Sequence, residues 1–294
     1  MTTCTHGFSV ASALDAHVAA TEDEREPDGC YHPSGLFSCE RQAIYGVRGV
    51  PQTNPVDAQT KRVFRVGHEL HRIVQTAVSS TEGSPETEVV FHEVKCHSPK
   101  LNLLGHADSL RMWIDEEADE LLAEVIEYKS IKESSLRYKN TMLPREEHVA
   151  QALVYAWILR HEPWYTEMEP DVEYLCPNCQ TPWKCNGPHE PQGERWEPRK
   201  PLGDRLRQVR ICYISKDDLN IIEFPVPVTD EGERKLEEYV ARLDKYRNDE
   251  TALPPRIFPG ESPPTNKIGR ANFPCGWCSW ETKCWIKDGI GVEL

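Results

Sequence analysis

Three charged residues in the middle of the chain have the chemistry of a hydrolytic site. Asp108 ends a Gly-His-Ala-Asp run, and Glu127 and Lys129 stand on either side of Tyr128. Side chains two residues apart on a β-strand face the same side, so Glu127 and Lys129 would share one face. Carboxylates placed side by side repel one another unless a cation lies between them, and oxygen ligands suit Mg²⁺ or Mn²⁺.

A predicted β-hairpin would bring these residues together. Apolar-rich strands over 101–114 and 121–130 flank an acidic segment, 115–120, which we interpret as a solvated turn. A turn centred between Glu117 and Ala118 places Asp108 opposite Glu127. A divalent ion there would activate a water and neutralise charge on a phosphodiester, while Lys129 would orient that water. The alternative is an exposed cross-strand set of charges without a metal.

Two predicted helices supply further candidates. The helix over 56–79 carries Gly67, a small residue suited to close packing, and one turn later His71, a candidate metal ligand. Its His-Glu-Leu-His run is one residue short of the zinc-protease pattern, so helical geometry excludes that class. In a helix over 145–160, Gln151 and Tyr155 are four residues apart and share a face. Taken alone, a helical histidine such as His71 is usually structural, and a tyrosine such as Tyr155 is more often a core residue.

The cysteines favour metal binding. The chain has 11 cysteines, an odd number, and no secretory signal is visible, so we expect a reducing cytoplasmic location and few disulfides. The tail carries Cys275 and Cys278 in CxxC spacing, followed by Cys284. Three thiolates leave a four-coordinate site incomplete, and Cys39, in a helix predicted over 35–47, is the candidate fourth ligand. A structural Zn²⁺ or unligated cysteines are the alternatives to an iron–sulfur cluster.

A second set of candidate ligands lies in an insertion predicted over 176–208. The set has zinc-knuckle spacing and comprises Cys176, Cys179, Cys185 and His189. The surrounding residues contain too little apolar surface to fold unaided, which favours zinc over unligated thiols in a loop. The basic run at 195–210 beside it is interpreted either as a platform for DNA or a partner, or as a solvated loop.

Composition and element order bound the fold class. With 38% hydrophobic and 28% charged residues, the chain has the composition of a soluble globular protein, and its longest apolar stretch, 149–159, is too short for a membrane span. The net charge of -14 argues against bulk electrostatic coating of nucleic acid. DNA would therefore bind locally, along the basic stretch 129–145.

The order of the expected elements predicts one mixed α/β domain over 1–294, with a tail from 254 to 294. Its further expected elements are strands at 172–175, 209–215 and 221–226 and a helix at 230–247.

Taken in their order along the chain, from Cys39 to Cys284, the motifs resemble the RecB-type branch of the PD-(D/E)XK nucleases. Within that branch they most resemble the iron–sulfur exonucleases allied to the CRISPR-associated Cas-four group and the AddB nuclease domain. The resemblance extends from Ser34 to Trp285. It implies a restriction-endonuclease-like central mixed sheet flanked by helices. It also implies a C-terminal clamp in which a [4Fe-4S] cluster is held by Cys39, Cys275, Cys278 and Cys284.

The resemblance also implies roles for the central residues. Mg²⁺ or Mn²⁺ would be held by His71, Asp108, Glu127 and the Tyr128 carbonyl. Lys129 would position the water, and Gln151 and Tyr155 would match a QxxxY motif that positions DNA. The expected function is a metal-dependent exonuclease that hydrolyses DNA from its ends, preferably single strands. It would act in recombination, repair or end processing, or with a protein partner in CRISPR adaptation.

Two other functions remain open at this level. A non-catalytic nucleic-acid or protein adaptor could retain the same fold and clusters. A restriction-type endonuclease would require base-reading loops, which the sequence does not identify. The 176–208 insertion, with its candidate zinc ligands, is foreign to the family pattern.

Overall fold

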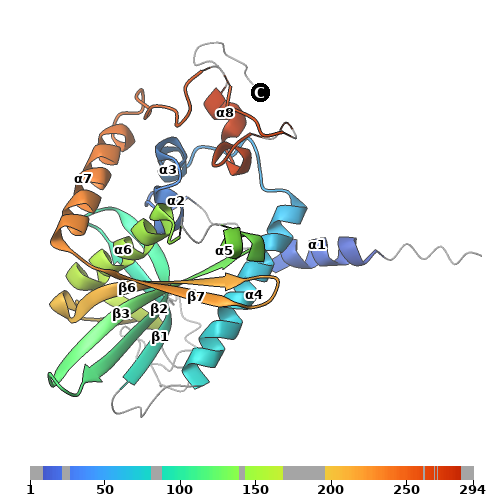
Figure 1. The fold of residues 1–294 in the computed structure, drawn as a ribbon. Helices are drawn as coiled ribbons and strands as arrows, with labels where there is room; N and C mark the ends of the chain where they lie inside the picture. The colour runs from blue at the N-terminus through green and yellow to red at the C-terminus, as the bar shows by residue number, and fades with distance from the viewer. Residues whose placement is uncertain are drawn as a thin grey trace, which may run out of the picture.

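The centre of the computed structural model is a seven-stranded mixed sheet in the order β5-β4-β1-β2-β3-β6-β7, with helices on both faces (Figure 1). The structure describes residues 9–21, 27–80, 88–138, 143–167, 196–260, 262–267, 269 and 271–285. The strands are β1 Glu88–Ser98, β2 Leu103–Asp115, β3 Glu120–Ile131, β4 Trp164–Glu167, β5 Trp196–Arg199, β6 Leu206–Ser215 and β7 Ile221–Pro227. The α-helices are α1 Val10–Thr21, α2 Pro33–Leu36, α3 Glu40–Val47, α4 Ala58–Ser80, α5 Glu133–Tyr138, α6 Glu146–His161, α7 Asp230–Arg247 and α8 Glu281–Trp285. The mixed α/β class is therefore confirmed.

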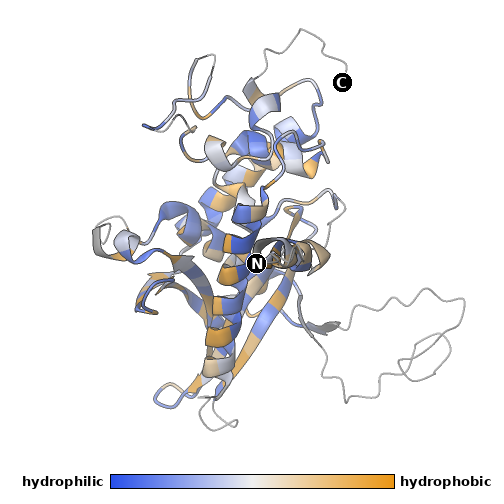
Figure 2. Cartoon of the chain, turned by 90° about the vertical axis from the view of Figure 1, so that its right-hand side faces the viewer, coloured by the Kyte–Doolittle hydropathy of each residue, from blue (hydrophilic) through white to orange (hydrophobic). Residues whose placement is uncertain are grey.

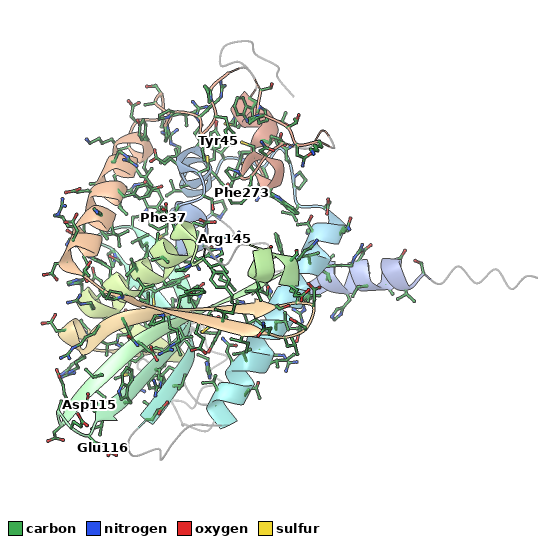
Figure 3. All side chains as sticks on the ribbon, viewed as in Figure 1. Phe37, Tyr45, Asp115, Glu116, Arg145 and Phe273 are labelled. Atoms are coloured by element: carbon green, nitrogen blue, oxygen red, sulfur yellow. The ribbon has the colours of Figure 1, made fainter. Side chains whose placement is uncertain are left out.

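The predicted hairpin is present as β2 and β3. The two strands pair antiparallel from Asp115 and Glu120 to Ser109 and Ile126, in the register expected from a turn centred between Glu117 and Ala118. The acidic turn is exposed and lies at the far tip of the hairpin, where Asp115 and Glu116 are well separated from Arg145 (Figure 3). Asp108 and Glu127 follow immediately beyond the last regular pair.

The two faces of β3 contact different helices. Ala123 and Val125 are buried in the main core with residues of α6, whereas Ile126 and Tyr128 pack with Val74 of α4. Because side chains alternate along a strand, Glu127 and Lys129 face α6. The strand β6 lies parallel to β3 and places Tyr213 beside Lys129. Helix α4 carries hydrophobic and hydrophilic residues along its length, as expected for a helix that packs on one side only (Figure 2).

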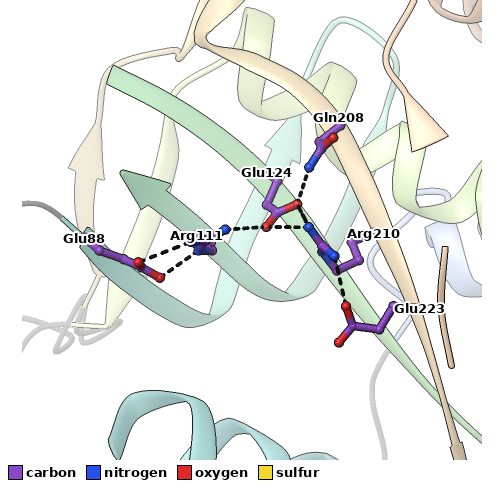
Figure 4. Close-up of polar contacts among 6 residues, drawn as sticks. All are labelled: Glu88, Arg111, Glu124, Gln208, Arg210 and Glu223. Atoms are coloured by element: carbon purple, nitrogen blue, oxygen red, sulfur yellow. Dashed lines mark hydrogen bonds and ion pairs between the residues drawn. The ribbon is translucent and has the colours of Figure 1, made fainter. Parts of the chain in front are cut away.

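The face of the sheet opposite α6 carries a charge network (Figure 4). Glu124, with 1% of its side chain exposed, accepts hydrogen bonds from Arg111 at 3.1 Å and Arg210 at 3.0 Å. Gln208 donates to the same carboxylate at 2.6 Å. Arg210 also pairs with Glu223. Arg207 pairs with Glu120, so these two arginines of the basic run at 195–210 are engaged in ion pairs.

The single helix predicted over 35–47 is wrong. The segment forms two short helices, α2 and α3, and Cys39 between them is extended, with φ -160° and ψ 122°. An extended residue cannot continue the helical hydrogen bonds, so the chain turns at the thiol-bearing position. The strands β1 and β4 were not predicted, because charged and histidine residues interrupt the apolar pattern of β1 and β4 has only four residues.

The strand predicted at 172–175 lies outside the described residues. The same holds for the candidate zinc ligands Cys176, Cys179, Cys185 and His189. The end of the predicted insertion is described from residue 196, where β5 pairs with β4 and so belongs to the central sheet. In the described part of the chain, no helix combines the length and apolar character needed to cross a membrane.

Candidate active site

Glu127, Lys129 and Gln151 form a closed triangle of hydrogen bonds. The Lys129 Nζ donates to Glu127 Oε1 at 2.7 Å and to Gln151 Oε1 at 2.8 Å. The Gln151 Nε2 donates to the same Glu127 oxygen at 2.7 Å. Only 2% of the Glu127 side chain is exposed. The structure therefore brings together the Glu and Lys of β3 and the Gln of α6, as the sequence predicts.

Asp108 reaches this group from β2. Its Oδ2 accepts a hydrogen bond from the backbone N–H of Tyr128 at 2.7 Å, and its Oδ1 lies 3.6 Å from the Nδ1 of His71. The ring of His71 packs edge-on against Tyr128, at 5.9 Å between centroids. Helix α4 thus places His71 beside Asp108 at the end of the hairpin.

Two glycines allow the flanking helices to approach. A Cβ on Gly67 would lie 3.1 Å from the Ser130 hydroxyl, a tight contact that would require the serine side chain to shift. A Cβ on Gly105 would lie 3.0 Å from Pro33 and 3.1 Å from the ring of Tyr155. Tyr155 is 3% exposed, so it supports the site from within the core. The close packing predicted for Gly67 is confirmed.

Burial sets the electrostatics of the site. Desolvation and the neighbouring Asp108 raise the pKa of Glu127 to about 7, although Lys129 and His71 act in the opposite direction. Burial lowers the pKa of His71, but the nearby carboxylates of Asp108 and Glu127 outweigh burial, so the net shift is upward. For Lys129, burial is likewise outweighed by the charges of Glu127 and Asp108, and its pKa is raised. Lys129 is therefore a cation at neutral pH.

The donor set fits a divalent cation. The Oε2 of Glu127 is buried and has no hydrogen-bond partner among the described residues. Such an oxygen costs about 1–3 kcal/mol unless it is satisfied, and a hard cation shared with Asp108 and His71 would satisfy it. Across the described residues, no group of three or more His, Cys, Asp or Glu already has the arrangement of metal ligands. Binding at this site would therefore require its side chains to draw together.

Four further residues near the site were not predicted. They are Gln75, Glu93, His148 and Tyr213. Gln75 donates to the Asp108 carbonyl at 2.9 Å and to Glu93 Oε1 at 2.8 Å, and Glu93 has a left-handed φ of 48°. Gln75 follows His71 by four residues, so helical spacing was a usable signal for it. Glu93 and Tyr213 depend on strand pairing that the sequence pattern does not reveal.

The four predicted cluster cysteines line one pocket. Cys39 precedes α3, Cys275 begins the 3-10 helix Cys275–Trp277, Cys278 follows that helix, and Cys284 lies in α8. None of the four forms a disulfide. Helices α3 and α8 lie close together at the top of the view in Figure 1, away from the sheet.

The chemistry of this pocket suits a thiolate-bound metal. Burial raises the pKa of Cys39 and Cys275, and that of Cys278 to about 11, so these thiols stay protonated at neutral pH unless a cation is bound. The backbone N–H of Trp280 points to Cys278 Sγ at 3.4 Å. Four thiols that line one pocket could supply the donor set of an iron–sulfur cluster or of structural zinc, provided that they draw together around the metal.

Direct hydrogen bonds also hold the tail to the beginning of the chain. The indole of Trp280 donates to the Val50 carbonyl at 2.8 Å. The backbone N–H groups of Thr53 and Asn54 both donate to the Ser279 carbonyl at 2.9 Å. These bonds anchor the tail, and its cysteines line one pocket together with Cys39.

Comparisons with known proteins do not assign a family. No family model matches the chain, and no curated protein matches it. Among solved structures, the chain is similar to one titled "Crystal structure of SSO0001", with 13% sequence identity, coverage of 93% of each chain and a TM-score of 0.45. A likeness at this level does not establish a family.

Proposed function

We propose that this protein is a Mg²⁺- or Mn²⁺-dependent DNA exonuclease of the RecB type within the PD-(D/E)XK nucleases. One observation carries the proposal. The carboxylates of Asp108 and Glu127 and the ammonium of Lys129 lie at the same end of one hairpin and interact electrostatically, and Glu127 keeps a buried oxygen without a partner among the described residues. Phosphodiester hydrolysis needs these parts.

Each side chain has a separate role in the proposed hydrolysis. A divalent ion bound by Asp108, Glu127 and His71 would act as a Lewis acid and lower the pKa of a bound water. Lys129 has three N–H donors, of which Glu127 and Gln151 accept two. Among the described residues the third has no acceptor, and it would orient the attacking water or contact a phosphate oxygen. Gln151 fixes the lysine, because it also bonds to Glu127.

The way in which DNA is cleaved and the type of metal cluster are inferred from the family that the motifs resemble. Cleavage from DNA ends, preference for single strands and a [4Fe-4S] cluster are properties of the family that the motifs resemble. The pocket lined by Cys39, Cys275, Cys278 and Cys284 supports the cluster, which would clamp the tail to α3. Arg145, at the start of α6, supports a DNA path along the basic side of the site.

The decisive assay compares end-labelled linear single-stranded DNA with circular single-stranded DNA, in Mn²⁺, using protein purified without oxygen. An exonuclease degrades the linear substrate and leaves the circle intact, whereas an endonuclease linearises the circle and an adaptor cleaves neither. We expect Lys129→Ala to lose activity at least about 100-fold, the scale set by removing one preorganised charge-stabilising donor. Lys235→Ala, on the exposed surface of α7, is the matched control. Robust cleavage by Lys129→Ala would contradict the proposal.

A further inference from the structure

His148 shares the site-facing side of α6. It precedes Gln151 by three residues, so the two side chains are neighbours on one helical face. Gln151 bonds to Lys129 on β3, and His148 bonds to Tyr213 on the adjacent strand β6, where Lys129 and Tyr213 are register partners. His148 therefore stands over the strand next to Lys129.

The hydrogen bonds of Tyr213 fix the tautomer of His148. The Tyr213 hydroxyl accepts from the backbone N–H of Arg145 at 3.0 Å and lies 2.8 Å from the Nδ1 of His148. Tyr213 is fully buried, and among the described residues His148 Nδ1 is the acceptor within reach of its O–H. The hydroxyl thus donates to Nδ1. In a neutral imidazole, the hydrogen then resides on Nε2.

The imidazole is neutral in this position. Burial lowers the pKa of His148 to about 3, and the charges of Lys129 and Arg145 act in the same direction. His148 is only partly buried, and among the described residues its Nε2 has no hydrogen-bond partner. The site therefore presents an uncharged N–H donor beside its lysine.

We propose that His148 is a phosphate-contacting residue whose Nε2–H donates to a phosphate oxygen of the bound DNA strand. This inference rests on the proposed function, because it takes the DNA to lie against Lys129. The contact would position the strand without adding a positive charge. It differs in this respect from contacts made by Lys129 or Arg145, which neutralise phosphate charge and release counterions.

Three variants separate this role from a structural one. His148→Phe keeps an aromatic ring but removes the donor, His148→Gln returns an N–H donor at a similar reach, and Tyr213→Phe removes the hydroxyl that sets the tautomer. Arg145→Ala is the matched charged control, three residues earlier on the chain. The readouts are the affinity for a fluorescein-labelled single-stranded oligonucleotide in Ca²⁺, its dependence on salt, and KM and kcat in Mn²⁺.

We expect His148→Phe to weaken binding and raise KM about 10-fold, with kcat nearly unchanged, since a hydrogen bond to a charged group contributes on this scale. His148→Gln should recover most of the loss, and Tyr213→Phe should show part of it. The slope of log affinity against log salt should be unchanged in His148→Phe and smaller by about one in Arg145→Ala.

Each outcome supports or overturns the proposed phosphate contact of His148. Wild-type affinity in His148→Phe, a slope reduced by about one in that variant, or no rescue by His148→Gln would overturn the proposal for His148 alone. Weakened binding with rescue in a protein that cleaves nothing would support His148 and refute the nuclease. A wild-type protein that neither binds nor cleaves DNA would overturn both.

Discussion

Asp108 and Tyr128 are joined across the hairpin by a hydrogen bond of 2.7 Å, from the backbone N–H of Tyr128 to Oδ2 of Asp108. This bond follows the last regular backbone pair of β2 and β3, so the aspartate side chain continues the pairing of the two strands. One carboxylate oxygen is thereby fixed by the backbone, and the other lies toward His71. The hairpin itself orients the carboxylate that we assign to the metal.

Asp108→Asn separates the structural from the chemical role of this residue. The amide oxygen can still accept from the Tyr128 N–H, so we expect the melting temperature to stay within about 3 °C of wild type. The charge that attracts the metal is lost, and cleavage should fall at least about 100-fold. Asp119→Asn, in the exposed turn, is the control and should retain full activity. A large loss of stability with proportionate loss of activity would argue against this division.

Glu127 gives the metal-free protein a characteristic pH dependence. Its pKa is raised from the ordinary 4.5 to about 7. The folded state therefore holds this proton more tightly than the unfolded state, and the resulting stability is present below about pH 4.5 and lost as the pH rises to about 7. We expect Glu127→Gln to be more stable than wild type at pH 8 in a chelator, with the difference shrinking toward pH 5. Equal differences in thermal melts at both pH values would refute this.

Arg48 connects the end of α7 to the beginning of the chain. Its Nη2 donates to the carbonyls of Asp249 at 2.5 Å and Ala252 at 2.9 Å, and also to that of Tyr246. The Tyr246 carbonyl belongs to the last turn of α7 and the other two follow it, where carbonyls lack the regular i+4 donors of the helix interior. We expect Arg48→Ala to lower the free energy of unfolding by about 2–4 kcal/mol, measured by urea denaturation.

Arg48→Lys should restore little of this loss, because an ammonium lacks the forked donors of guanidinium. Arg72→Ala provides the comparison, since the Arg72 side chain is 73% exposed and its ion pair within the described residues is with a surface glutamate one turn away. Similar destabilisation in Arg48→Ala and Arg72→Ala would show that the Arg48 contacts contribute little.

The cysteine pocket predicts iron in protein prepared without oxygen. We expect a brown preparation with about four iron atoms per chain, the content of a [4Fe-4S] cluster. Cys284→Ser should lose the colour and most of the iron, whereas Cys30→Ser, outside this pocket, should keep both. Visible absorption and metal analysis provide the measurement. A colourless protein containing zinc at these cysteines would leave the fold in place and refute the iron assignment.

The sequence was informative where the backbone geometry is local. The spacing of Glu127 and Lys129, the position of the turn and the helical spacing of Gln151 and Tyr155 each follow from a period of two or of 3.6 residues. These local rules predicted the β2–β3 register and the shared face of the Glu and the Lys, and both are confirmed. The proximity of Gln151 to both residues agrees with the motif interpretation.

The remaining features depend on contacts between distant segments. The parallel pairing of β3 with β6 brings Tyr213 beside Lys129, and the sequence pattern gives no register for such a pair. The sequence does not reveal the contacts of Arg48, because its partners are backbone carbonyls some 200 residues away. Every residue has a backbone carbonyl, so residue types give no signal for such contacts. The sequence predicts Cys39 within a helix, whereas it lies in an extended link between two helices.

Binding of one divalent ion by Asp108 and Glu127 can be measured by titration with Mn²⁺ followed by electron paramagnetic resonance. We predict one tightly bound Mn²⁺ per chain in the wild-type protein at pH 8, weaker binding as the pH falls below about 7 and Glu127 gains its proton, and no such binding in the Asp108→Asn, Glu127→Gln double variant. Equal Mn²⁺ binding by the double variant, or none by the wild-type protein, would contradict the account.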